Sequence, residues 1–122
     1  ESDNQRGFFE GAVVKLVTFF QDGMDYTSSE DCRNVREWLK IEFNGDFVQV
    51  GGKAIKIGKS TKGRLNEGFL ERAIDWIEEN YGVKREDVLN PKEYKKWQDE
   101  IYPYGGPETY IDYLIEIGLL KN

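Results

Sequence analysis

Residues 12–20 have the sequence AVVKLVTFF and form the longest strongly apolar run of the chain. Together with Phe9, the apolar positions of this region recur at i, i+3, i+4, i+7, i+8 and i+11. This spacing predicts a helix over about residues 3–21, opened by the capping-box pattern Ser2-x-x-Gln5 and stopped by Gly23. The β-branched and aromatic content would also suit a buried strand. The run falls far short of the ~20 residues that a membrane span needs.

Further helix signals follow along the chain. The predicted helices cover residues 28–43, after the capping box Thr27-Ser28-Ser29-Glu30; 67–81, capped by Asn66 and ended by Gly82; a short segment from Asn90-Pro91 through Trp97; and a last segment from Gly106-Pro107 through Ile117. Proline favours the first turn of a helix, and glycine favours the residue just after one. The chain is therefore predicted to be mainly helical, with four to five helices.

One β-hairpin is predicted over residues 46–57. Two short apolar segments flank Gly51-Gly52, which is typical of a two-residue turn. Phe47 is expected to share an apolar face with Ile55 and Ile57. A lone two-stranded hairpin is only marginally stable, so we expect it to pack on the helices, or to pair with a further strand or a second copy of the chain.

Length and composition predict a single α+β domain over residues 1–122. A chain of 122 residues with 39% hydrophobic and 14% aromatic residues can bury a substantial core. The expected parts are a helical body over 1–43 and 64–100, the hairpin over 46–57 and a helical tail over 101–122. Trp38 and Trp76 lie among apolar residues, and at least one of them is expected to be substantially buried.

The side-chain inventory argues against an enzyme. The chain has no histidine, which excludes Ser-His and Cys-His nucleophilic chemistry and makes a zinc site improbable. Cys32 is the only cysteine, so no intrachain disulfide can form, which fits a reducing cytoplasm. We therefore expect no catalytic residues, no metal and no cofactor.

Charge is segregated along the chain. The formal net charge is −6, yet residues 47–66 contain five basic residues and no acid, which leaves 12 basic against 23 acidic residues elsewhere. A local basic segment in an acidic protein is where a phosphate backbone would bind. The predicted nucleic-acid-binding residues are Lys53, Lys56, Lys59, Ser60, Thr61, Lys62 and Arg64. The alternative is a solvated hairpin whose lysines discourage edge-to-edge pairing.

Two other patterns carry less weight. Gly58-Lys59-Ser60-Thr61 resembles the end of a P-loop, but Lys53 stands where the first glycine of that motif is required. The tyrosines of the C-terminal region could stack on bases, although at helical and turn spacing such residues more often lie at the edge of a core; they are Tyr102, Tyr104, Tyr110 and Tyr113.

The last helix should place Tyr110, Ile111, Leu114 and Ile115 on one side. We expect this side to dock on the body rather than to present a patch to a partner.

Three short motifs resemble those of a phage family. They are Ser2-x-x-Gln5-Arg6-Gly7-Phe8-Phe9-x-Gly11-Ala12-Val13-Val14, then Leu39-Lys40-x-x-Phe43, then Lys59-Ser60-Thr61-Lys62-x-x-Leu65. In this order they resemble the NinB (Orf) family of recombination mediators from phage recombination cassettes, over residues 2 to about 97. The family usually has a strand region before the first motif, and the chain starts at Glu1 rather than at a methionine, which together suggest a fragment.

The resemblance implies a non-enzymatic α+β protein of a phage, in the cytoplasm of a bacterial host. It implies a dimer that binds single-stranded DNA and helps to load a recombination protein, without nuclease activity. Only Lys59 to Lys62 match the Lys-Ser-Thr motif and carry this expectation. The alternative function is a non-enzymatic protein–protein interaction module that uses the aromatic C-terminal region.

Overall fold

The computed structural model of the chain describes residues 3–44, 46–57 and 68–121. Its elements in chain order are α1 (Asp3–Phe8), the π-helical η1 (Phe9–Val13), α2 (Val14–Phe20), α3 (Ser29–Asn44), β1 (Asp46–Val50), β2 (Lys53–Ile57), α4 (Phe69–Tyr81), α5 (Pro91–Lys96), the π-helical η2 (Trp97–Ile101), the 3₁₀ turn η3 (Tyr102–Tyr104) and α6 (Tyr110–Glu116). The described residues are thus mainly helical with one two-stranded antiparallel hairpin, which confirms the predicted fold class.

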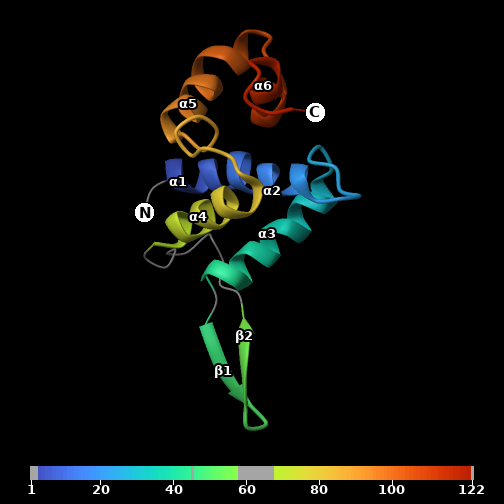
Figure 1. The fold of residues 1–122 in the computed structure, drawn as a ribbon, viewed down its shortest axis with the longest axis vertical. Coiled ribbons are helices and arrows are strands. Elements are labelled where there is room, and N and C mark those ends of the chain that lie inside the picture. The colour runs from blue at the N-terminus through green and yellow to red at the C-terminus, as the bar shows by residue number, and fades with distance from the viewer. Residues whose placement is uncertain (1–2, 45, 58–67, 122) are drawn as a thin grey trace.

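A central helix, formed by α1, η1 and α2, crosses the middle of the molecule, with α3 and α4 on one side of it and α5 and α6 on the other (Figure 1). This helix is buried on nearly every side. Its buried residues are Phe8, Phe9, Ala12, Val13, Val14, Leu16, Val17 and Thr18. The one polar residue among them, Thr18, is satisfied because its hydroxyl donates to the carbonyl oxygen of Val14 at 2.8 Å. A helix that is buried on all sides is apolar all round, which explains why the β-branched and aromatic content of this region would also suit a buried strand.

The helix starts lie close to the predicted ones at α3 and further from them at α4 and α6. The cap of α3 is one residue later than the capping box Thr27…Glu30 predicted, because the Ser28 hydroxyl, not that of Thr27, accepts from a backbone N–H of the first turn, that of Asp31 at 3.2 Å. α4 begins at Phe69 rather than at the predicted Glu67, because the residue before it, Gly68, is left-handed (φ 77°). The predicted cap, Asn66, lies outside the described residues. At α6 the extended Thr109 is the cap, so the helix begins at Tyr110 rather than at Pro107.

The hairpin projects from the helical body at the end where α3 stops (Figure 1). Its turn is Gly51-Gly52, both with positive φ (58° and 79°), as the two-residue turn requires. The register places Phe47 opposite Lys56, so Phe47 is out of phase with Ile55 and the predicted shared apolar face is wrong.

The C-terminal tail docks on the body, as expected. Tyr110, Ile111 and Leu114 of α6 are buried in the core, and Ile115 packs against it. Among the tryptophans, Trp97 is the buried one, whereas Trp76 is half-buried and Trp38 is 40% exposed. The expectation that Trp38 or Trp76 would fill the core is therefore met only in part, by the half-buried Trp76.

Candidate nucleic-acid interface

The hairpin and the segment after it leave and rejoin the body at one place. Arg72, in the first turn of α4, donates from Nη2 to the backbone carbonyl oxygen of Phe43, near the end of α3, at 2.9 Å. This hydrogen bond ties the end of α3 to the start of α4. Both ends of the intervening residues 45–67, which include the whole acid-free segment, are consequently attached to neighbouring points of the body.

Two of the predicted binding residues lie in the described hairpin. Lys53 is the first residue of β2, opposite Val50 and next to the turn, and its side chain is exposed. Lys56 belongs to β2, where the backbone register places it opposite Phe47. The other predicted residues lie outside the described part of the chain; they are Lys59, Ser60, Thr61, Lys62 and Arg64.

An aromatic row runs over α3 and α4 from the foot of the hairpin; its members are Phe43, Trp38, Trp76, Tyr81 and Phe20. The ring centroids of Trp38 and Trp76 are 5.2 Å apart, and that of Phe43 is 6.1 Å from Trp76. Tyr81 continues the row at 5.4 Å from Trp76 and stacks on Phe20 at 4.6 Å. All of these distances lie in the range of favourable aromatic pairs.

The row is open to solvent at Trp38, which is 40% exposed, while its other members are half-buried. The Tyr81 hydroxyl accepts a hydrogen bond from Gln21, and burial raises the pKa of Tyr81. Tyr81 is therefore held at the inner end of the row as a neutral phenol, and Trp38 supplies the accessible π-face.

Two of the three basic side chains of α3, those of Arg36 and Lys40, are engaged by carboxylates, whereas Arg33 is exposed. Lys40 Nζ lies 2.7 Å from a carboxylate oxygen of Glu37, and the hydrogen bond from Lys40 lowers the pKa of Glu37. Arg36 lies 3.5 Å from Glu10 and 3.4 Å from Glu37. Positive charge for a phosphate backbone must therefore come mainly from the hairpin and the residues that follow it.

The sequence indicated the charge but missed the aromatic row. Its members come from α2, α3 and α4, and only the packing of these helices brings them together. Of the tyrosines considered from the sequence, Tyr110 is buried and Tyr113 half-buried, whereas Tyr102 and Tyr104 are exposed on η3. Trp38 and Trp76 are far apart in the sequence, so no periodic pattern joins them.

Other kinds of site find little support in the described residues. They contain no group of three or more Cys, Asp or Glu side chains that could hold a metal ion. Nor does any helix among them have the length and apolarity to cross a membrane. No family model, curated protein or solved structure matches the chain.

Proposed function

We propose that this protein binds single-stranded nucleic acid. Lysines of the acid-free segment contact phosphates, and bases stack on the aromatic row at Trp38. In line with its resemblance to phage recombination mediators, we assign it to recombination of phage DNA in a bacterial cytoplasm, without catalytic activity of its own. The observation that carries the proposal is the position of the aromatic row, which begins where the basic segment joins the body.

The combination of a basic segment with an exposed aromatic ring suits a single strand better than a duplex. Proteins that bind single strands without base readout join a positive groove to aromatic side chains on which the bases stack. A duplex keeps its bases stacked on each other and offers no free face to an indole ring. Because the whole protein carries a net charge of −6, contact with nucleic acid should be local and should weaken steeply as salt rises.

The first test measures anisotropy of a labelled oligothymidine of about 20 nucleotides at several salt concentrations. Changing Lys56, Lys59 and Lys62 together to Glu should abolish binding at moderate salt. Changing them to Gln should reduce the slope of log affinity against log salt by about 2, because each phosphate contact in a single strand contributes about 0.7. A matched control makes the same changes at three exposed lysines outside the acid-free segment, Lys84, Lys92 and Lys96.

The second test separates stacking from charge. Trp38→Ala should weaken binding by about 1–3 kcal/mol while leaving the salt slope unchanged, since no phosphate contact is lost. Tyr104→Ala, at an 84% exposed aromatic of η3, is the matched control and should bind like the unmodified protein. Undetectable binding by the unmodified protein at low salt, or equal loss from both sets of lysine changes, would refute the proposal.

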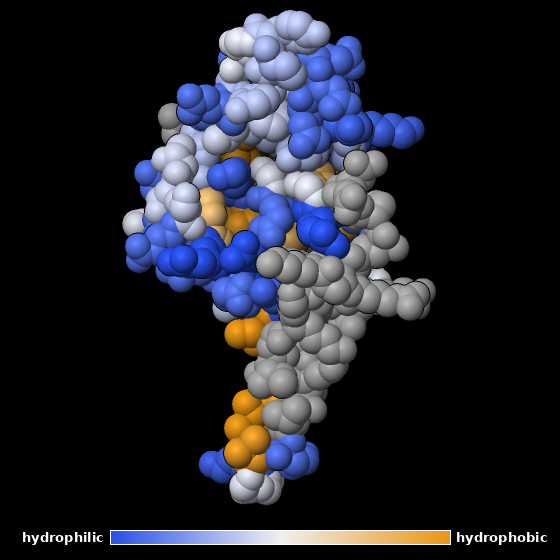
Figure 2. All heavy atoms as spheres, turned by 180° about the vertical axis from the view of Figure 1, so that it is seen from behind, coloured by the Kyte–Doolittle hydropathy of each residue, from blue (hydrophilic) through white to orange (hydrophobic). Residues whose placement is uncertain are grey.

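A second candidate function is protein–protein interaction through the hairpin. Val50 is 55% and Ile55 43% exposed, and Figure 2 shows apolar surface gathered near the hairpin tip. Within the described residues each strand also has one edge without a partner strand, which is the usual template for pairing with another chain. Val50→Lys with Ile55→Lys should leave oligonucleotide binding intact under the leading proposal and abolish partner binding under this one.

A further inference from the structure

A lysine of α2 and the cysteine of α3 lie side by side, next to the loop that joins the two helices. Lys15 Nζ is 3.8 Å from Cys32 Sγ, although the two positions are 17 residues apart in the chain. Both residues are half-buried, so a small molecule in solvent can reach them. Reactive cysteines are found where a partly exposed thiol has a cation beside it.

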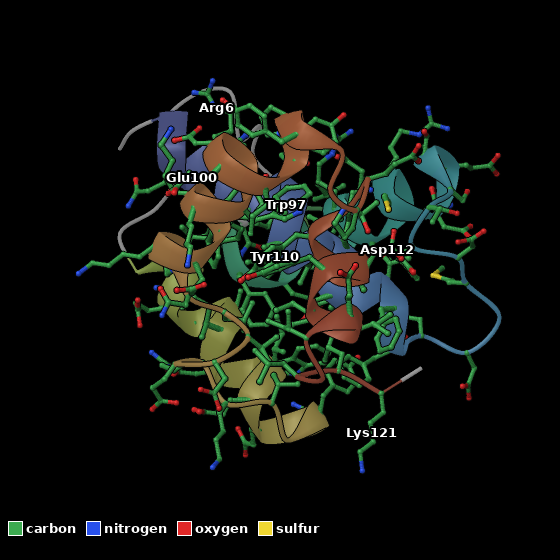
Figure 3. The ribbon with its side chains drawn as sticks, turned by 90° about the horizontal axis from the view of Figure 1, so that it is seen from above. Arg6, Trp97, Glu100, Tyr110, Asp112 and Lys121 are labelled. Atoms are coloured by element: carbon green, nitrogen blue, oxygen red, sulfur yellow. The ribbon has the colours of Figure 1, made fainter. Side chains whose placement is uncertain are left out.

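The backbone carbonyl oxygen of Tyr26, in the α2–α3 loop, holds the two groups in place. It accepts a hydrogen bond from Lys15 Nζ at 3.2 Å and another from the Cys32 thiol at 3.2 Å. Tyr26 is itself fixed, because its hydroxyl donates to the carboxylate of Asp112, a residue of α6 that is labelled in Figure 3. The approach of the amine to the sulfur therefore depends on α2, α3 and α6 together.

Lys15 has no carboxylate in the described part of the chain that would hold its ammonium group elsewhere. Its partners there are the carbonyl oxygen of Tyr26 and the sulfur of Cys32. By contrast, Lys40 of α3 lies 2.7 Å from a carboxylate oxygen of Glu37. The nitrogen of Lys15 is thus placed to react at the sulfur.

The lack of a second cysteine decides what an oxidised Cys32 can become. A peroxide converts a thiol to a sulfenic acid, whose sulfur is then attacked by another thiol or by a nitrogen nucleophile. Cys32 is the only cysteine of the chain, so no intrachain disulfide can form. The side-chain nitrogen in contact with the sulfur is that of Lys15, and lysine amines are good nucleophiles. The flexible stem of lysine can close the remaining gap.

We propose that Lys15 and Cys32 form a site of oxidative cross-linking, at which a hydroperoxide joins Lys15 Nζ to Cys32 Sγ through a sulfenamide bond. In the first step the O–O bond of hydrogen peroxide breaks, the thiol becomes a sulfenic acid, and one water molecule is released. In the second step the deprotonated amine attacks the sulfur, the S–O bond breaks, and the hydroxyl group leaves with an amine proton as a second water molecule. The sulfur is oxidised by two electrons, the peroxide is reduced, and the protein loses two hydrogen atoms.

This modification goes beyond the proposed function, because it needs no nucleic acid. The new bond fastens α2 to the first turn of α3 and closes a loop between residues 17 positions apart. Closing such a loop restricts the unfolded chain, so the cross-linked protein should melt several degrees higher than the reduced one.

The test treats the folded full chain with a small excess of hydrogen peroxide and reads the products by mass spectrometry. The intact mass should fall by about 2 Da, whereas a sulfenic or sulfinic acid raises it by about 16 or 32 Da. Trypsin cannot cut after a cross-linked Lys15, so residues 7–33 should stay together as one peptide that is lighter by two hydrogen atoms. Dithiothreitol should reverse the change, whereas sulfinic and sulfonic acids would persist.

Three variants test the assignment. Lys15→Arg keeps the positive charge but replaces the amine with a guanidinium group, which is a far weaker nucleophile. The loss of two hydrogen atoms should therefore disappear, and dimedone, which traps sulfenic acids, should label Cys32 several-fold more than in the unmodified protein. Cys32→Ser should not form the cross-link. The matched control, Lys40→Arg, should form it like the unmodified protein.

Unfolding supplies a control that does not depend on the folding of any variant. In concentrated guanidinium chloride the two side chains are no longer held together, so peroxide should produce oxygen acids of Cys32 and far less cross-link. Equal cross-linking of the folded and unfolded chain would overturn the proposal, as would a loss of two hydrogen atoms that persists in Lys15→Arg. Oxygen acids of Cys32 as the only products of the folded protein, or a disulfide between two chains, would overturn it as well.

Discussion

Gly11 in the central helix lies against the ring of Tyr94, and replacing it with alanine should destabilise the protein. A Cβ atom added at Gly11 would lie 2.0 Å from the Tyr94 hydroxyl oxygen, 2.8 Å from its Cζ and 3.0 Å from its Cε1. The ring cannot move aside freely, because it is buried between Phe8 at 5.8 Å and Tyr110 at 5.1 Å. The clash can therefore be relieved only if core residues around Tyr94 also shift.

Two opposing effects set the size of the change. Overpacking a core costs about 1–3 kcal/mol, and occasionally more. Exchanging glycine for alanine inside a helix returns up to about 1 kcal/mol. With an overlap this severe, we expect Gly11→Ala to lower the free energy of unfolding by about 2 kcal/mol, or the melting temperature by roughly 8 °C.

Urea unfolding followed by circular dichroism measures this change, and Gly7 supplies the control. No described atom lies within 4 Å of a Cβ added at Gly7, in the same helix, so Gly7→Ala should be neutral or stabilising by up to about 1 kcal/mol. Tyr94→Phe removes the nearest atom and should recover about 1 kcal/mol in the double variant. Equal or higher stability of Gly11→Ala would refute this account of the core.

Three other predictions concern α6 and its contacts. Leu114→Ala should cost about 2–5 kcal/mol in chemical unfolding because Leu114 is buried, whereas exposed Ile117→Ala should cost far less; similar losses would contradict the docking of α6. Thr109→Ala removes the acceptor for the backbone N–H of Asp112 (3.1 Å) and should cost about 1 kcal/mol, with Thr109→Ser retaining most of the stability. The hydrogen bond from Tyr26 to Asp112 raises the pKa of Tyr26 to about 12, so the protonated phenol is favoured in the fold. Its contribution is complete below the ordinary pKa of 10.0 and is lost as pH rises toward 12, so unfolding midpoints should fall over this interval, and less so in Tyr26→Phe.

Much of the fold could be predicted because its signals are local. The i, i+3, i+4 spacing of residues 69–81 is contained within one helix, and Gly51-Gly52 fixes its turn through backbone conformation alone. The same turn also fixes the register. Since Val50 lies opposite Lys53, counting back from the turn places Phe47 opposite Lys56, so the sequence itself contains the register that excludes a shared face with Ile55.

The features that escaped prediction depend on contacts between distant residues. Asn66 is a better cap than glycine by intrinsic preference, but the left-handed Gly68 sets the start of α4 as the chain enters the body. Trp38 and Trp76 belong to different helices, and their 5.2 Å contact follows from how α3 packs on α4. The approach of Lys15 to Cys32 is likewise visible only once α2 and α3 are packed together.

Aromatic contacts connect the central helix to both ends of the molecule. On one side Phe20 stacks on Tyr81, and the aromatic row leads from there to the foot of the hairpin. On the other side Phe8 contacts Tyr94, which contacts Tyr110 at the start of α6. The two routes leave from opposite ends of one buried helix and share no ring. A defect at Gly11 and Tyr94 should therefore disturb the packing of α6 before it reaches Trp38, so Gly11→Ala should lower stability while oligonucleotide binding at Trp38 is retained by the folded protein.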